Sequence, residues 1–249
     1  MPVSRLRFSH LKAMGRSPAH CAELRQRDIA PTSAMSRGSA VHALVLGGPR
    51  VVAWEEGRQR RGKDFDAFAA ANEDARILTA AEYETANRMA EAVKKNVLAM
   101  AVLGGVREQT IHWTARGIEC RGTPDAAEYS SHVADLKTTV TAEPGRFTWL
   151  ALRAAYHAQL AWYMDGIKAA GLGTPREAYV VAVEATRPHP VTVLHLTARA
   201  LEQGRALYSS WLERYRQCDL AGQWPEYAQD LIALDVADEV ELDFGEAGQ

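Results

Sequence analysis

Two aspartates and a lysine stand in the stretch GTPDAAEYSSHVADLKTT, residues 122–139, which otherwise has the pattern of a β-hairpin. Successive side chains of a strand point to opposite faces, so Asp135 and Lys137 are expected on one face and Leu136 on the other. Asp125 lies on the preceding predicted strand, and a short turn can bring it beside Asp135. Two carboxylates on one face repel each other, and the pKa of one is raised unless a cation lies between them. The pattern therefore predicts a cation site.

This pair of carboxylates with a lysine fits hydrolysis of a phosphate ester. Carboxylate oxygens suit Mg²⁺, which takes few protein ligands and keeps several waters for a phosphate substrate. A lysine beside such a metal can orient or help deprotonate the attacking water, and it can stabilise developing negative charge. The alternative is an exposed salt bridge between Lys137 and either aspartate, because Asp-x-Lys triplets are common by chance.

Four further polar residues are candidates for the same site. His42 stands in the apolar stretch GSAVHALVL, where it is either a metal ligand or a buried core histidine. Glu108 opens the strand before Asp125 and could supply another oxygen. Gln159 and Tyr163 are one helical turn apart and share a face, which is either part of the site or the polar edge of a buried helix.

Charge is unevenly distributed along the chain. Residues 1–63 contain 12 Lys and Arg against 4 Asp and Glu, whereas residues 235–249 contain six acids and no base. The basic third could bind a polyanion such as DNA, or it could be an ordinary solvated surface. The residues proposed for DNA contact are Arg58, Arg60, Arg61 and Lys63.

Length and composition indicate an ordinary globular protein. The 249 residues are 47% hydrophobic and 24% charged, and no apolar run approaches the roughly 20 residues that span a bilayer. The N-terminus lacks the apolar region of a secretory signal, and three distant cysteines argue against a disulfide framework. These features predict a cytoplasmic protein, in a bacterium or a phage-infected host cell, with no membrane partner.

The order of predicted elements gives the fold class. The chain is expected to be α/β: a single domain of residues 1–249 with a central mixed β-sheet flanked by helices. It comprises a basic N-terminal region with the histidine-bearing helix (1–63), a catalytic sheet with a long helix (104–197) and an acidic tail (235–249). Helices are predicted at 37–47, 79–103, 144–170 and 198–217. Strands are predicted at 107–115, 118–129 and 132–139, as a meander, and at 177–186 and 190–197.

Four short motifs follow one another along the chain: GSAVH (38–42), GTPD (122–125), DLK (135–137) and QLAWY (159–163). In this order they resemble the PD-(D/E)xK nuclease superfamily and, within it, the RecB-like branch, which implies a fold of the restriction-endonuclease-like type. Three further stretches, SPAHCAEL (17–24), YHAQLAWYMDG (156–166) and CDLAGQWPEY (218–227), resemble the exodeoxyribonuclease VIII (RecE-like) group of phage and prophage. The resemblance therefore covers nearly the whole chain.

The resemblance implies a role for each matching residue. His42, Asp125, Asp135 and the backbone carbonyl of Leu136 are implied as ligands of Mg²⁺, with Mn²⁺ as a substitute. Lys137 is implied to activate water. Gln159 and Tyr163 are implied to position the active site and contact the DNA backbone, while Glu108 matches less securely.

Some relatives carry an iron–sulfur cluster on four cysteines, but this chain has only Cys21, Cys120 and Cys218. Four thiolate ligands cannot be supplied, so no cluster is expected.

The activity implied by the resemblance is that of an exonuclease in DNA recombination. It would degrade one strand of linear duplex DNA from a 5′ end and expose a 3′ single strand for an annealing or recombinase protein, and it would form a homo-oligomer. Two alternatives remain: a single-strand-specific or endonucleolytic enzyme with the same residues, and a non-catalytic DNA-binding protein on a nuclease scaffold.

Overall fold

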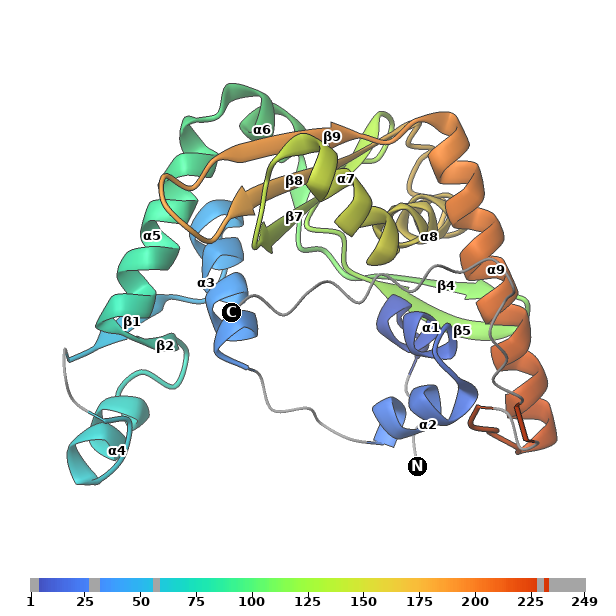
Figure 1. Ribbon diagram of the computed structural model, residues 1–249, viewed down its shortest axis with the longest axis horizontal. Coiled ribbons are helices and arrows are strands. Elements are labelled where there is room, and N and C mark those ends of the chain that lie inside the picture. Colours follow the sequence, from blue (N-terminus) through green and yellow to red (C-terminus); the bar gives the residue numbers. More distant parts are fainter. Residues whose placement is uncertain (1–4, 27–31, 56–58, 228–230, 233–249) are drawn as a thin grey trace, which may run out of the picture.

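The central feature of the computed structural model is a five-stranded mixed sheet (Figure 1). Strands β7 and β8 run parallel, and the other neighbouring pairs are antiparallel. The structure describes residues 5–26, 32–55, 59–227 and 231–232. The predicted α/β fold class with a central mixed sheet is thereby confirmed. In spatial order the strands are β3 (Val106–Arg107), β6 (Ala126–Glu128), β7 (His132–Thr139), β8 (Glu177–Glu184) and β9 (Val191–His195).

Helices cover both faces of this sheet, which explains why β8 is nearly continuously apolar. On one face Val180 and Ala182 join the core beneath α7 (Pro144–Arg153), α8 (Tyr156–Ala169) and α9 (Ala198–Ala221). On the other face Val181 and Val183 join the core beneath α3 (Ser33–Leu46), α5 (Ala80–Lys95) and α6 (Val97–Val102). The face of β7 that carries Asp135 and Lys137 is the face that α8 covers.

Strand β7 matches its predicted bounds, but the predicted three-stranded meander is wrong. The runs 107–115 and 118–129 are each interrupted, so the hairpin of β4 (Ile111–Ala115) and β5 (Ile118–Gly122) forms a sheet of its own. Glu108 interrupts the first run with a φ of 47°, a conformation uncommon outside glycine. The segment from Thr123 to Asp125, which contains a proline, interrupts the second. Strand β6, not β5, therefore pairs with β7.

Two predicted long helices are each split in the structure. The predicted helix 144–170 breaks between α7 and α8, where Ala155 is left-handed with a φ of 59° and ends the helical hydrogen bonding. The predicted helix 79–103 breaks at Asn96, whose extended backbone separates α5 from α6 and whose side chain caps α6 by accepting the Ala99 N–H. Neither break coincides with a glycine or proline.

Smaller elements complete the described part of the chain. Helix α3 begins four residues before the predicted start, because the side chain of Thr32 caps it, and α9 continues to Ala221. The three cysteines are buried free thiols. Elements without a sequence prediction are α1 (Phe8–Met14), α2 (Pro18–Gln26), β1 (Val51–Trp54), α4 (Lys63–Ala70) and β2 (Arg76–Thr79).

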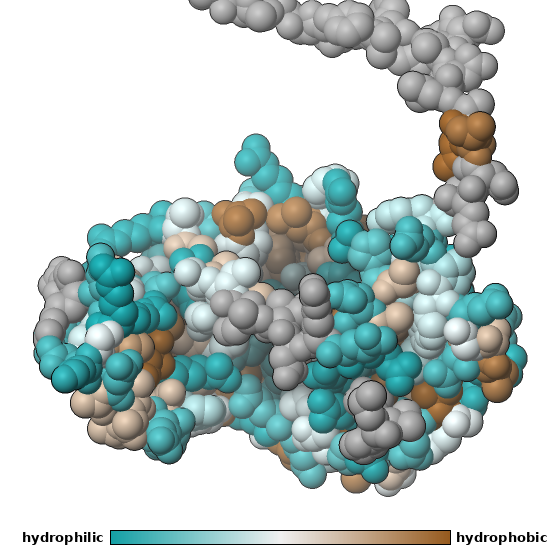
Figure 2. All heavy atoms as spheres, turned by 90° about the horizontal axis from the view of Figure 1, so that it is seen from below, coloured by the Kyte–Doolittle hydropathy of each residue, from teal (hydrophilic) through white to brown (hydrophobic). Residues whose placement is uncertain are grey.

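The surface and the terminal region bear on two further predictions. No helix among the described ranges has the length and apolarity needed to cross a membrane. On the face that Figure 2 shows, hydrophilic residues predominate and the apolar areas are small and separate. The predicted acidic tail, 235–249, lies outside the described residues.

Candidate active site

Asp125 and Asp135 lie side by side where β6 meets β7. The last paired residues of these antiparallel strands are Ala126 and Ala134. Asp125 and Asp135 are the next residues along, so they lie at the end of this pairing. The Oδ2 atom of Asp125 accepts a hydrogen bond from the Leu136 N–H at 2.7 Å. Asp135 is almost completely buried, with 3% of its surface exposed. The structure thus brings together the two carboxylates that the sequence placed in one site.

Lys137 lies on the same face of β7 as Asp135 and forms an ion pair with its Oδ2 atom. Its Nζ is 4.9 Å from the centre of the Tyr156 ring, which adds a cation–π contact. Burial alone lowers the pKa of Lys137, but the negative charges of Asp135 and Asp125 outweigh burial and raise it above the ordinary lysine value. Lys137 is therefore protonated. It is not the exposed lysine of a surface salt bridge, which was the alternative interpretation of the sequence.

The two aspartates have pKa values shifted in opposite directions. Burial, and then the charge of Asp125, raises the pKa of Asp135 to about 6. Burial also acts to raise the pKa of Asp125, but the hydrogen bond and charge of His42, with Lys137 and the Leu136 N–H, lower it overall. Asp135 thus keeps its proton to a higher pH than Asp125 does, as expected when like charges are buried together.

His42 approaches this pair from α3, on the other face of the sheet. Its Nδ1 is 3.4 Å from the Oδ1 atom of Asp125. Burial lowers the pKa of His42, but the hydrogen bond and charge of Asp125 outweigh it and raise the pKa. Gly38, in the same helix, allows the close approach, because a Cβ there would lie 3.1 Å from the hydroxyl of Thr138 on β7. His42 is thus an acid-contacting residue and not an isolated core histidine.

Gln159 and Tyr163 project from α8 toward Asp135. The Nε2 atom of Gln159 donates a hydrogen bond to the Tyr163 hydroxyl at 3.0 Å and lies 3.4 Å from Asp135 Oδ1. The Tyr163 ring packs against Gly122, where a Cβ would lie 2.8 Å from the ring. The structure therefore joins the predicted helix pair to the predicted acids.

Glu108 and Leu136 are placed differently. The Glu108 N–H donates to the backbone carbonyl of Asp125 at 3.1 Å, but its side chain lines a separate cavity of about 130 Å³ with His42 and Arg76. Glu108 and Lys137 therefore line different cavities. The N–H of Leu136 points toward Asp125. Because the N–H and C=O of one residue in a strand point to the same side, the Leu136 carbonyl also points toward the side on which Asp125 lies.

The structure places the predicted basic cluster away from this site. Arg60 is ion-paired with Glu82, which also caps α5 through Thr79. Arg61 and Lys63 line a cavity with Trp54 beside α4, at the end of the molecule opposite α9 (Figure 1). Arg58 lies outside the described residues. Contact of these side chains with DNA stays a prediction.

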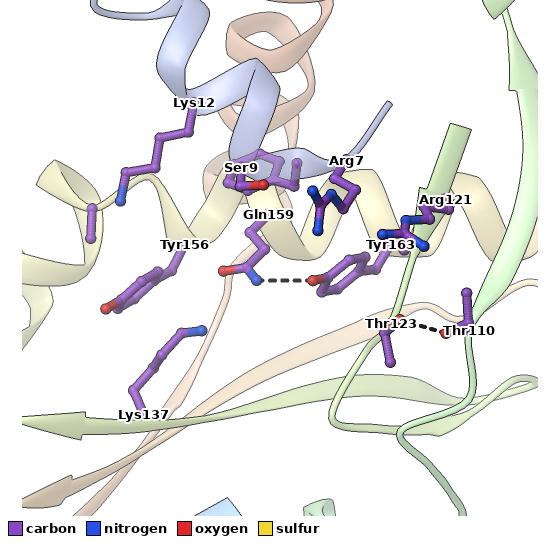
Figure 3. Close-up of a pocket in the computed structure, with 13 residues that line it drawn as sticks. Arg7, Ser9, Lys12, Thr110, Arg121, Thr123, Lys137, Tyr156, Gln159 and Tyr163 are labelled. Carbon is purple, nitrogen blue, oxygen red and sulfur yellow. Dashed lines mark hydrogen bonds between the residues drawn. The ribbon is translucent and has the colours of Figure 1, made fainter. Parts of the chain in front are cut away.

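A cavity of about 570 Å³ opens above Lys137, Gln159 and Tyr163 (Figure 3). Three basic residues that sequence reasoning did not single out for the site also line it: Arg7, Lys12 and Arg121. In the sequence, Arg7 and Lys12 contribute only to the excess of basic residues in the N-terminal third. No motif or spacing around Arg121 indicates a role in the site. The cavity is therefore lined by three basic residues in addition to Lys137.

Comparison with known proteins agrees with this geometry. A family model described as "PDDEXK-like domain of unknown function (DUF3799)" matches residues 7–234. The chain belongs to this family. Its Pro124-Asp125 and Asp135-Leu136-Lys137 supply the letters of the PDDEXK pattern, with aspartate at the D/E position.

A solved structure has the same fold as this PDDEXK-like chain. It is the crystal structure at 2.19 Å resolution of a protein from Eubacterium rectale named "Putative exonuclease". The match has a TM-score of 0.67 with 12% sequence identity, and it covers 94% of this chain and 91% of that chain. Among curated proteins, none matches this chain.

The side chains of the PDDEXK-like site fit a divalent cation that takes few protein ligands. Within the described residues, no three His, Cys, Asp or Glu side chains form a ready-made metal cage. Two buried carboxylates with an imidazole beside them nevertheless form a hard, oxygen-rich donor set. Mg²⁺ is commonly held by one or two carboxylates and completes its coordination with water and phosphate oxygens. The raised pKa of Asp135 reflects negative charge that such a cation would neutralise.

Proposed function

We propose that this PDDEXK-like protein is a divalent-metal-dependent deoxyribonuclease that acts as an exonuclease on linear duplex DNA. One observation carries the proposal: Asp125 and Asp135 lie together where β6 meets β7, and Lys137, in contact with Asp135, lines a cavity with Arg7, Lys12 and Arg121. Two carboxylates and an ammonium beside a cavity lined by basic residues suit a phosphodiester better than a neutral or cationic substrate.

In this proposal Asp125 and Asp135 hold the cation, with His42 and the carbonyl of Leu136 as further ligands. Mg²⁺ is the expected ion and Mn²⁺ its substitute. When bound, such a cation supplies a Lewis acid that polarises a phosphate oxygen and lowers the pKa of a coordinated water.

Lys137 orients the attacking water and stabilises the negative charge that develops on the phosphate. Its raised pKa keeps it a cation, which favours charge stabilisation and hydrogen-bond donation over proton abstraction. The Tyr156 ring beneath its Nζ and the Asp135 carboxylate hold the ammonium in place.

Gln159 and Tyr163 position the acids and the strand. The amide of Gln159 bridges the Tyr163 hydroxyl and Asp135, so it restricts the rotamer of the carboxylate. Tyr163 lines the cavity, where its hydroxyl is within reach of a backbone phosphate. None of these contacts distinguishes one base from another, because phosphate contacts carry no sequence information.

The finer features of the proposal are supported by the motif resemblance. The RecE-like stretches favour 5′-to-3′ degradation of one strand, with the exposed 3′ strand passed to an annealing or recombinase protein, and they favour a homo-oligomer. The fold similarity to the Eubacterium rectale protein, whose name includes exonuclease, supports exonucleolytic over endonucleolytic action.

The test is digestion of linear duplex labelled at the 5′ or the 3′ end, alongside closed circular duplex and single strands, with and without Mg²⁺. Loss of 5′ label as mononucleotides, with intact circles, is the expected result. Cleavage of circles would indicate an endonuclease, and cleavage of single strands alone would indicate a single-strand-specific enzyme. DNA binding without cleavage in Mg²⁺ and Mn²⁺ would leave only the non-catalytic alternative.

A further inference from the structure

The wall of the active-site cavity that faces β7 is basic. Arg7 precedes α1, Lys12 lies within α1, and Arg121 comes from β5, so two segments distant in sequence meet there. In Figure 3 the side chains of Lys12 and Lys137 enter the cavity from opposite sides, and the guanidinium groups of Arg7 and Arg121 lie near the Tyr163 ring. The cavity therefore has cations on both sides.

These three cations have no acidic partner. No carboxylate among the residues that the structure describes lies within ion-pair distance of any of them. Nearby basic residues outside the cavity do have partners: Arg5 pairs with Glu119 at 3.3 Å, and Arg116 pairs with Glu213 at 3.0 Å. Among the described residues, Arg7, Lys12 and Arg121 are thus three cations without an ion pair that share one cavity.

Concentrating unpaired cations in one cavity is unfavourable without an anion. Burial, and then the charge of Lys137, lowers the pKa of Lys12, so the two ammonium groups repel each other across the cavity. The charges of Arg7 and Arg121 also act on buried His10, whose pKa is lowered. An anion between the walls would relieve this repulsion.

We propose that Arg7, Lys12 and Arg121 bind a second phosphate of the substrate strand, next to the phosphate that is cleaved at Asp135 and Lys137. The inference rests on the proposed function. Phosphates along one strand of a duplex are about 3.4 Å apart in axial rise, so a cavity of about 570 Å³ has room for more than one.

The chemistry of the wall matches a phosphate. Arginine donates several hydrogen bonds in a planar fork that fits phosphate oxygens, and lysine adds a point charge. The hydroxyls of Ser9, Thr110 and Thr123 line the same cavity and are further donors. A phosphate held there fixes the position of the strand relative to the cleaved bond without reading its bases.

The first experiment measures duplex binding as a function of salt concentration for Arg7→Gln, Lys12→Gln and Arg121→Gln. Arg5→Gln and Arg116→Gln are matched controls, because these residues are basic, belong to the same segment and hairpin, and are already paired with acids. All proteins also carry Asp135→Asn, so that binding is read without cleavage, and unfolding transitions verify the fold.

Each wall variant is expected to lower the slope of log K against log salt by about 0.9 per lost contact. It is also expected to weaken affinity by on the order of tenfold, whereas the controls remain near the parent value. In cleaving proteins the same substitutions are expected to raise KM more than they lower kcat. Wall variants that behave like the controls in slope, affinity and KM would overturn the inference.

The second experiment identifies which phosphate is bound. Single uncharged methylphosphonates are placed at successive positions of the strand, and duplex ends carrying a terminal phosphate are compared with ends carrying a hydroxyl. If a methylphosphonate at one internal position weakens binding to the parent protein but not to Arg121→Gln, the bound phosphate is internal. If removal of the terminal phosphate weakens binding to the parent protein but not to Arg121→Gln, the bound phosphate is a terminal monoester. No position with such a dependence would contradict the subsite.

Failure of this inference is distinguishable from failure of the proposed function. A wild-type protein that cleaves DNA while its wall variants match the controls refutes the phosphate subsite alone. A wild-type protein that never cleaves DNA, but whose wall variants bind it more weakly than the controls, refutes the nuclease and retains the subsite.

Discussion

The backbone N–H of Leu136 donates a hydrogen bond to Asp125 Oδ2 at 2.7 Å, which ties the acid before β6 to the strand that carries the other acid. This bond, and the contact between His42 and the second oxygen of the same carboxylate, satisfy both oxygens of Asp125. Asp125 is therefore held rigidly beside Asp135, although it lies on the irregular segment between β5 and β6.

Replacing Asp125 with asparagine is expected to lower the pKa of His42. The hydrogen bond and charge of Asp125 raise this pKa against the opposing effect of burial, and asparagine removes the charge while keeping the shape. An NMR titration of the imidazole in metal-free protein measures the change. If His42 titrates at the same pH in both proteins, the contact between Asp125 and His42 does not exist in solution.

Lys137→Ala and Asp135→Ala are expected to differ in metal binding although both lose activity. Removal of a positioned cation of this kind typically costs on the order of a hundredfold or more in rate, but Lys137→Ala removes no proposed ligand. Calorimetric titration with Mg²⁺ or Mn²⁺ should show binding to Lys137→Ala and none to Asp135→Ala. If Lys137→Ala cleaves DNA at the wild-type rate, Lys137 is only a salt-bridge partner of Asp135 and has no role in the reaction.

Metal removal is expected to abolish cleavage. Mg²⁺ or Mn²⁺ should restore it after treatment with EDTA, whereas Ca²⁺ should support DNA binding without turnover because its coordination is larger and looser. The measurement is digestion of labelled linear duplex at a fixed concentration of each ion. Undiminished digestion in excess EDTA would exclude the proposed role of the two aspartates.

The free energy of unfolding is expected to fall as pH decreases from about 6.5 to 4, in part because of His10. This residue is fully buried, its Nδ1 accepts the Arg7 N–H at 3.3 Å, and burial with nearby arginines lowers its pKa to about 4. The unfolded chain, with a histidine pKa of about 6.5, binds a proton in this window that the folded protein does not. The stabilisation is thus complete above pH 6.5, and each pH unit below it removes up to about 1.4 kcal/mol.

Urea unfolding at several pH values measures this contribution. His10→Asn is expected to flatten the pH dependence, while His112→Asn, at an exposed position, is the control and is expected to leave it unchanged. Parallel curves for wild-type protein and His10→Asn would show that the pKa of His10 is the same in the folded and the unfolded chain.

Gly122→Ala is expected to lower both stability and activity. The added Cβ would lie 2.8 Å from the Tyr163 ring and 3.2 Å from Trp113, so the ring must move and overpacking of this kind costs about 1–3 kcal/mol. Displacement of Tyr163 breaks its hydrogen bond with Gln159. Thermal unfolding and duplex digestion test the two effects, and His112→Ala, at an exposed position of the same hairpin, is the control. If Gly122→Ala is destabilised but has normal activity, the position of Tyr163 is not required for the reaction.

The sequence alone determined the local geometry of the site. The period of two along 132–139 fixes Asp135 and Lys137 on one face of a strand, and the structure places them there as an ion pair. The helical spacing of Gln159 and Tyr163 fixes them on one face of α8, where they share a hydrogen bond. Both relationships follow from the two-residue period of a strand and the 3.6-residue period of a helix, and a short stretch of sequence is enough to recognise either period.

Tertiary structure decided where the elements break and which of them meet. Ala155 and Glu108 adopt left-handed conformations that no local signal predicts; the first divides a predicted helix and the second interrupts a predicted strand. The surroundings also decide which charges are paired: Arg60 is neutralised by Glu82, whereas Arg7, Lys12 and Arg121 face the cavity without an acid. A count of charges along the chain cannot separate these cases, because electrostatic energy depends on distance in the folded protein and not on separation in sequence.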